Sequence, residues 1–131
     1  MRTPLLALAA ALACAALPVA ASAKRPSPEA QLARVTEGRV AGEPVTCLNN
    51  LRFTSTRIID GTAIVYEAGN TVWVNRPRGG AQGLDQWDVL VTRQYSSQLC
   101  SGDVVRLYDT SARMETGAVF LGEFVPYRRA R

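Results

Sequence analysis

Cysteine and histidine decide which chemistry this chain can perform. The 131-residue sequence contains three cysteines and no histidine. Serine and cysteine hydrolases of the usual kinds need an imidazole as the base, and most catalytic zinc sites need imidazole ligands. Neither Cys47 nor Cys100 belongs to a C-x-x-C pair, the pattern typical of thiol redox chemistry. The sequence therefore predicts no catalytic residue, no metal site and no cofactor.

Asp85 and Asp88 flank Trp87 and have a spacing that could support other chemistry. Two carboxylates close together can act as acid and base or can hold a cation. In a turn that precedes a predicted strand, they fit a capped bend equally well. We predict that the chain is not an enzyme, and a hydrolase that uses carboxylates alone is the weakest alternative.

Arginine is concentrated in a glycine-rich loop and in the C-terminal tail, residues 128–131. The residues that could bind an anion are Arg76, Arg78, Arg128 and Arg129. A forked guanidinium group suits phosphate or carboxylate, so an anionic polymer or lipid of the cell envelope is the partner that these side chains would bind. The alternative is a solvated loop and a frayed terminus.

Residues 1–23 have the anatomy of a signal peptide. Arg2 provides the positive start, residues 5–19 form an apolar stretch, and residues 21–23 form a small-x-small cleavage site. Cleavage there would leave 14 of the 15 basic residues against 11 acidic ones, a net charge of +3 that does not indicate nucleic acid as a partner. We expect a periplasmic or secreted protein of bacterial origin. The alternative is a lipoprotein anchored to the membrane through Cys14.

Export determines what the two remaining cysteines can do. In an oxidising compartment Cys47 and Cys100 are expected to form a disulfide. Each precedes a predicted strand, and in a compact sheet two strand entrances can lie at the roughly 5.5 Å Cα separation that a bridge needs. On the chain-entropy model, closing this loop stabilises the folded domain by about 4 kcal/mol.

The elements that must position these residues are short strands. Apolar residues alternate or run together in about six segments. The segments are 53–59, 63–67, 71–75, 88–93, 104–108 and 117–125, the last with Gly122 as a candidate bulge. Several carry apolar residues on both faces, so we predict that residues 47–127 form an all-β domain, a small antiparallel barrel or a tight sandwich. The closed barrel is preferred because it removes edge strands.

Residues 24–46 have the composition of a linker. A short helix is predicted inside it, with Ser27 as N-cap, Pro28 at the first helical position and an end near Val35. A helix of this length is unstable unless it docks on something. We interpret the stretch as a tether with a frayed helical turn.

Individual side chains in the strands have two interpretations. Trp73 and Tyr66 could form a stacking platform for a sugar or another ring, but large aromatic residues of a small barrel are usually core. Arg57 is expected to pair with Asp60 across the first hairpin, in an interaction worth under about 1 kcal/mol.

The order of several motifs resembles an uncharacterised, domain-of-unknown-function family of small exported proteobacterial proteins. The motifs are Cys47, STRIIDGTAIVY (55–66), VWVN (72–75), GLDQWD (83–88), LCSGDVVRL (99–107) and FLGEFVPY (120–127). Members of that family often carry two further cysteines, at places that here resemble Ala81 and Val119. The resemblance implies that the pair lost is a second bridge, with Cys47 and Cys100 left as partners. It implies no activity, cofactor or catalytic residue.

The sequence thus predicts an exported periplasmic β-domain with a non-enzymatic structural or binding role. The alternative is an envelope-binding module that holds an anionic polymer or lipid through its arginine loop and tail. Membrane association is expected only if Cys14 is lipidated.

Overall fold

The computed structural model describes residues 18–49 and 52–131. Within them the chain forms one α-helix, a short 3-10 turn and ten strands. In chain order these are α1 (Pro28–Val35), β1 (Arg39–Ala41), β2 (Cys47–Asn49), β3 (Ser55–Ile59), β4 (Ala63–Ala68), β5 (Thr71–Asn75), η2 (Ala81–Gly83), β6 (Val89–Thr92), β7 (Gln98–Cys100), β8 (Val104–Asp109), β9 (Met114–Phe120) and β10 (Phe124–Arg129). The sequence did not predict β1, β2 and β7, because three residues are too few to establish an alternating pattern.

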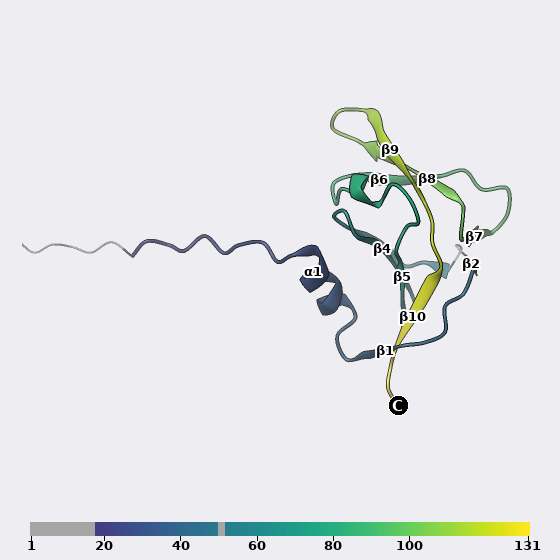
Figure 1. The fold of residues 1–131 in the computed structure, drawn as a ribbon, viewed down its shortest axis with the longest axis horizontal. Coiled ribbons are helices and arrows are strands. Elements are labelled where there is room, and N and C mark those ends of the chain that lie inside the picture. The colour runs from purple at the N-terminus through teal and green to yellow at the C-terminus, as the bar shows by residue number, and fades with distance from the viewer. Residues whose placement is uncertain (1–17, 50–51) are drawn as a thin grey trace, which may run out of the picture.

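The strands form three antiparallel sheets. The largest has the order β1-β10-β5-β4-β3, the second has the order β6-β8-β9, and β2 pairs with β7 in a two-stranded ribbon. Figure 1 shows the three-stranded sheet at the top, the large sheet below it and the ribbon at the right. The prediction of an all-β domain is confirmed, in its sandwich form. The closed barrel is not formed, because the sheets stay separate and leave β3 and β6 as edge strands.

The five-stranded sheet is buried on both faces. Successive side chains of a strand point to opposite faces, so neighbouring residues enter different cores. Ile58 packs in a core with Leu107 and Leu121, on the side of the smaller sheets. Ile59, its neighbour in β3, packs in a second core with Leu32 of α1. This arrangement explains why the predicted strands are apolar on both faces without a closed barrel.

Most of the stretch 24–46 is docked on the domain, through α1 and β1, which corrects its interpretation as a tether. Ser27 caps α1 by accepting a hydrogen bond from the backbone N–H of Ala30 at 3.2 Å, as predicted. Leu32 is 5% exposed, and its burial against the large sheet supplies the docking that so short a helix needs. β1 then pairs with β10 and forms one edge of the large sheet. Residues 18–27 extend away from the domain, at the left of Figure 1.

The segment 117–125 is not one strand with a bulge. It is divided between β9 and β10, and the chain passes from one sheet to the other at residues 121–123. Gly122 lies so close to the carbonyl oxygen of Arg76 that a Cβ there would collide with it. The buried side chain of Asn75 donates to the Gly122 carbonyl at 2.8 Å and accepts from its N–H at 2.9 Å. The glycine therefore marks a crossover between sheets.

Candidate functional site

A groove of about 920 Å³ lies between two edge strands that belong to different sheets. One wall is β3 with Ser55, Thr56, Arg57 and Ile58, and the opposite wall includes Val89 and Thr92 of β6. Its volume is near the upper end of the range for small-ligand pockets. We refer to it below as the β3–β6 groove.

The groove runs along the edge of β3. Side chains alternate between the two faces of a strand, so a cavity over one face would be lined by every second residue. Four consecutive residues of β3, from Ser55 to Ile58, line this groove. The exposed edge of the strand, with its backbone groups, therefore forms the wall.

Aromatic and apolar side chains form the floor. Tyr66 of β4 is buried, and its ring centroid lies 4.8 Å from that of Phe53 and 5.8 Å from that of Phe124. Burial raises the pKa of the Tyr66 hydroxyl above its ordinary value of 10, so this group stays protonated. The interpretation of Tyr66 as core is confirmed. It also lines the groove, together with Leu99 of β7.

Hydrogen bonds close the groove at the β3–β4 turn. Asp60 accepts from the backbone N–H of Gln86 at 2.7 Å, and the Gln86 side chain lies 3.4 Å from the other carboxylate oxygen. The N–H of Gly61 donates to the carbonyl of Leu84 at 2.9 Å. The expected Arg57–Asp60 ion pair is not among those formed in the described part of the chain. Asp60 instead holds the end of β3 to the segment that leads into β6.

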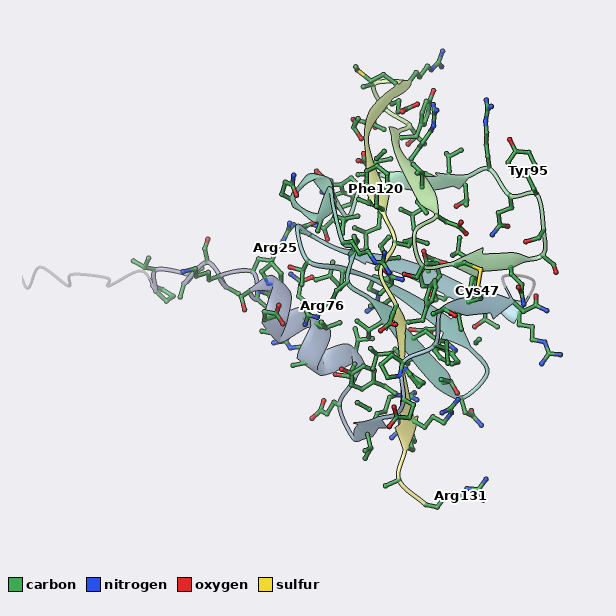
Figure 2. All side chains as sticks on the ribbon, turned by 45° about the vertical axis from the view of Figure 1, so that its right-hand side comes forward. Arg25, Cys47, Arg76, Tyr95, Phe120 and Arg131 are labelled. Atoms are coloured by element: carbon green, nitrogen blue, oxygen red, sulfur yellow. A yellow bond between two sulfur atoms is a disulfide. The ribbon has the colours of Figure 1, made fainter. Side chains whose placement is uncertain are left out.

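The disulfide lies toward the other end of the groove. Cys47 and Cys100 are directly opposite each other in the β2–β7 ladder and are bonded, as predicted. Figure 2 shows this bond joining the two strands at the right of the domain. The backbone N–H of Cys100 also donates to the Asp103 carboxylate at 2.7 Å. Since Leu99 of β7 lines the groove, the bridge fixes part of the groove's floor in place.

Asp85 and Asp88 each have a separate structural partner. Asp85 accepts from the backbone N–H of Trp87 at 2.9 Å, and Asp88 accepts from the hydroxyl of Thr116 at 2.6 Å. Only Asp88 lines the groove. The capped bend offered as the alternative accounts for Asp85. Among residues 18–49 and 52–131, no group of three or more His, Cys, Asp or Glu side chains could hold a metal ion.

The arginine loop and the arginine tail are not brought together. Arg76 forms a two-point ion pair with Glu29 of α1, at 3.0 and 3.1 Å, and Figure 2 shows it beside that helix. The register of β5 with β10 places Arg76 and Arg128 at opposite ends of this strand pair. Arg78, which follows in the same loop, is exposed, and its backbone N–H donates to the carbonyl of Phe120 at 2.8 Å.

The tail arginines gather with an arginine that the sequence analysis missed. Arg39 of β1 is the register partner of Arg129, and Arg128 and Arg129 line a separate cavity of about 390 Å³ beside Thr71. The Arg128 guanidinium lies 5.5 Å above the ring of Trp73. Trp73 is therefore half-buried and partly covered by a cation, rather than wholly core.

Two exposed aromatic residues flank β6 and were also missed. Trp87, just before the strand, is 73% exposed, and Tyr95, just after it, is fully exposed. In Figure 2 the Tyr95 side chain projects from the loop between β6 and β7. Aromatic residues are enriched at binding interfaces, because they offer a large apolar surface with a polar end. No sequence pattern distinguishes them from core aromatic residues, since only the fold decides which side of the molecule they occupy.

Comparison of the chain with family models, with curated proteins and with solved structures found no match. The resemblance to a family of exported proteins therefore stays a prediction. No helix within the described residues is long and apolar enough to cross a membrane. The predicted signal peptide and Cys14 lie largely outside the described residues, Cys14 wholly so.

Proposed function

We propose that the protein is an exported, non-enzymatic binding domain that holds its ligand in the β3–β6 groove. The observation that carries this proposal is that two edge strands from different sheets line one cavity. A small sandwich has no structural need for such an opening, because pairing the two edges would bury more surface and remove both edges. The cysteine bridge is consistent with an oxidising compartment outside the cytoplasm.

Export is supported by the anatomy of residues 1–23. We expect the mature protein to begin at Lys24, and intact-mass spectrometry of the protein purified from the producing cells checks this. Retention of Cys14 at a lipidated N-terminus would instead support the lipoprotein alternative. A mature chain that still begins at Met1 in the cytoplasm would contradict export altogether.

Neighbouring residues of β6 provide a matched pair of variants that tests the groove. Thr92 lines it, whereas Val91 points to the opposite face of the strand and is exposed. Thr92→Trp should fill the groove, and Val91→Trp adds the same side chain outside it. A ligand present at about ten times its Kd stabilises a protein by about 1.4 kcal/mol, which corresponds to roughly 5–10 °C in Tm for a domain of this size.

The measurement is the Tm of each variant in the presence of peptide, glycan and small-molecule fractions from the producing cells. At least one fraction should raise the Tm of the native protein and of Val91→Trp, but not that of Thr92→Trp. If no fraction raises the Tm, or if all three proteins respond alike, the groove is not a binding site.

A second candidate function is binding of an anionic envelope component at the arginine tail. Arg39 and Arg129 are directly opposite in the β1–β10 pair, and like charges in that position are unfavourable. Neither forms an ion pair in the described part of the chain. An anion between them would relieve the repulsion.

The test is sedimentation with phosphatidylglycerol vesicles across a range of salt concentrations. Arg128→Ala combined with Arg129→Ala should abolish a salt-sensitive association. Arg76→Ala should leave it unchanged, because Arg76 lies far from the tail and is paired with Glu29. Equal effects of both changes would show that net charge, and not this cluster, is responsible.

A further inference from the structure

We propose that the ligand of the β3–β6 groove is an extended polypeptide segment that adds to the edge of β3 as a further antiparallel or parallel strand. This inference rests on the proposed function and names the chemical class of its ligand. Strand addition uses main-chain hydrogen bonds for affinity and alternating side-chain pockets for specificity.

The register of the sheet determines which backbone groups of β3 face the groove. Ala68, the last residue of β4, closes a two-residue turn onto β5, and residues that close such a turn exchange hydrogen bonds. Backbone groups alternate sides along a strand, so Val65 faces the other neighbour, β3, where its partner is Arg57. Thr56 and Ile58 therefore direct their N–H and C=O groups away from β4 and into the groove.

No other segment occupies this edge within the described part of the chain. β3 pairs with β4 alone, and none of the hydrogen bonds outside the regular strand pairs involves the backbone of residues 55–58. The edge of β9 is treated differently. The segment with Arg78 and Gly79 covers it. The N–H of Arg78 donates to the carbonyl of Phe120 at 2.8 Å, and the N–H of Phe120 donates to the carbonyl of Gly79 at 3.0 Å.

The sequence of β3 has few of the devices that usually prevent strand addition. Proteins protect exposed edges with proline, charged side chains, above all lysine, with bulges or with very short strands. β3 is five residues long, contains neither proline nor lysine, and pairs with β4 in an uninterrupted register. Its single charged residue, Arg57, and its position along the wall of the groove are the protection that it has.

A peptide fits these walls better than a glycan does. A row of N–H and C=O groups at strand spacing is complementary to another strand, whereas a sugar needs donors and acceptors in the plane of its ring. Every second side chain of an added strand would face the apolar floor formed by Tyr66, Leu90 and Leu99. The intervening side chains would face Arg57, which is exposed and forms no ion pair among the described residues. We therefore expect apolar residues at alternate positions, separated by polar or acidic ones.

The probe is a library of random heptapeptides displayed on phage and selected against the disulfide-bonded protein. Selected peptides, made synthetically, should bind the native protein with an alternating pattern of apolar residues. Thr56→Pro removes the N–H that faces the groove and leaves the β3–β4 hydrogen bonds in place. It should weaken binding at least about tenfold, while the matched control Thr56→Val keeps the N–H and should stay within about twofold.

A second measurement does not depend on the folding of a proline variant. Methylation of single backbone nitrogens in the peptide should weaken binding to the native protein about tenfold at every second position, and have little effect at the positions between. An effect with no period of two would overturn strand addition. Circular dichroism of Thr56→Pro shows whether its loss of binding reflects loss of the fold.

The remaining outcomes separate this inference from the proposed function. The selection could yield no peptide, while glycan strands free of peptide bind the native protein and Thr92→Trp does not bind them. The groove would then remain a binding site, but its ligand would not be a polypeptide. A self-associated protein that Thr56→Pro converts to monomers would show a second copy at the edge, and would also overturn the polypeptide ligand. A selected peptide that binds Thr92→Trp as well as the native protein would contradict both proposals.

Discussion

The side chain of Asn75 forms hydrogen bonds that a neighbouring strand's backbone would otherwise form. Asn75 follows the apolar pair Trp73 and Val74 in β5, and its amide forms both hydrogen bonds that a paired strand residue would offer to Gly122. The chain leaves β9 at this point and cannot pair regularly, so a buried amide is needed to satisfy the Gly122 groups. One side chain thereby holds the crossover between the two main sheets.

Replacing Asn75 should therefore be costly. Asn75→Ala leaves a buried N–H and a buried C=O of Gly122 without partners, which should lower the free energy of unfolding by about 2–4 kcal/mol. Urea unfolding followed by circular dichroism measures this. Asn70→Ala, at an exposed hairpin turn, should change the value by under about 0.5 kcal/mol. Similar losses in both variants would mean that the Asn75 hydrogen bonds do not support the crossover.

At the scale of elements, α1 is held on the sheet domain by apolar packing and by an ion pair. Leu32 is buried against the large sheet, and Glu29 pairs with Arg76 in the loop after β5. The hydrogen bond from Arg76 lowers the pKa of Glu29 below its ordinary value of 4.5, and the attraction of the Arg76 charge adds a smaller effect in the same direction. Gln31 of the same helix lines the β3–β6 groove, so the position of α1 affects the groove.

The Glu29 pair predicts a dependence of α1 on pH. A carboxyl whose pKa is lowered on folding contributes stability above its unfolded pKa, and loses that contribution as the pH falls through the lower folded value. The amide protons of α1 should therefore exchange faster, relative to those of β4, at a pH below 4.5 than above it. Glu29→Gln should exchange fast at both pH values. If hydrogen exchange of α1 in the native protein does not change with pH relative to β4, the apolar packing of α1 alone keeps it on the sheet.

At the scale of the whole molecule, the disulfide joins two strands that are paired in space but far apart in the chain. Cys47 and Cys100 are 53 positions apart, and β2 and β7 pair only with each other. A loop of this size gives a stabilisation of about 4 kcal/mol on the chain-entropy model, which is a large part of the stability of a small domain.

Removal of the bridge should lower stability and loosen the groove together. Replacing both cysteines by alanine should lower the Tm by more than about 10 °C and increase hydrogen exchange around Leu99. A reductant should produce the same change in the native protein and none in the double variant, which serves as its control. If a reductant changes neither the Tm nor the hydrogen exchange of the native protein, the bridge does not stabilise the fold.

Some of this protein was determined by local sequence alone. Turn residues and alternating apolar residues placed β4 and β5 within a residue of their observed bounds, since adjacent hairpins depend on short-range pairing. Ser27 and Pro28 placed the start of α1, because capping is local chemistry. The pairing of Cys47 with Cys100 followed from the absence of any other cysteine in residues 24–131.

Only the tertiary structure decided where the site lies. The sequences of β3 and β6 have no feature that marks them as a site. They form the two walls of a groove because each is the last strand of its sheet and both unpaired edges face one cavity. The docking of α1 and the separation of Arg76 from Arg128 likewise depend on contacts between distant segments. Periodicity reports which face of a strand is buried, whereas an unpaired edge depends on which strands are absent beside it.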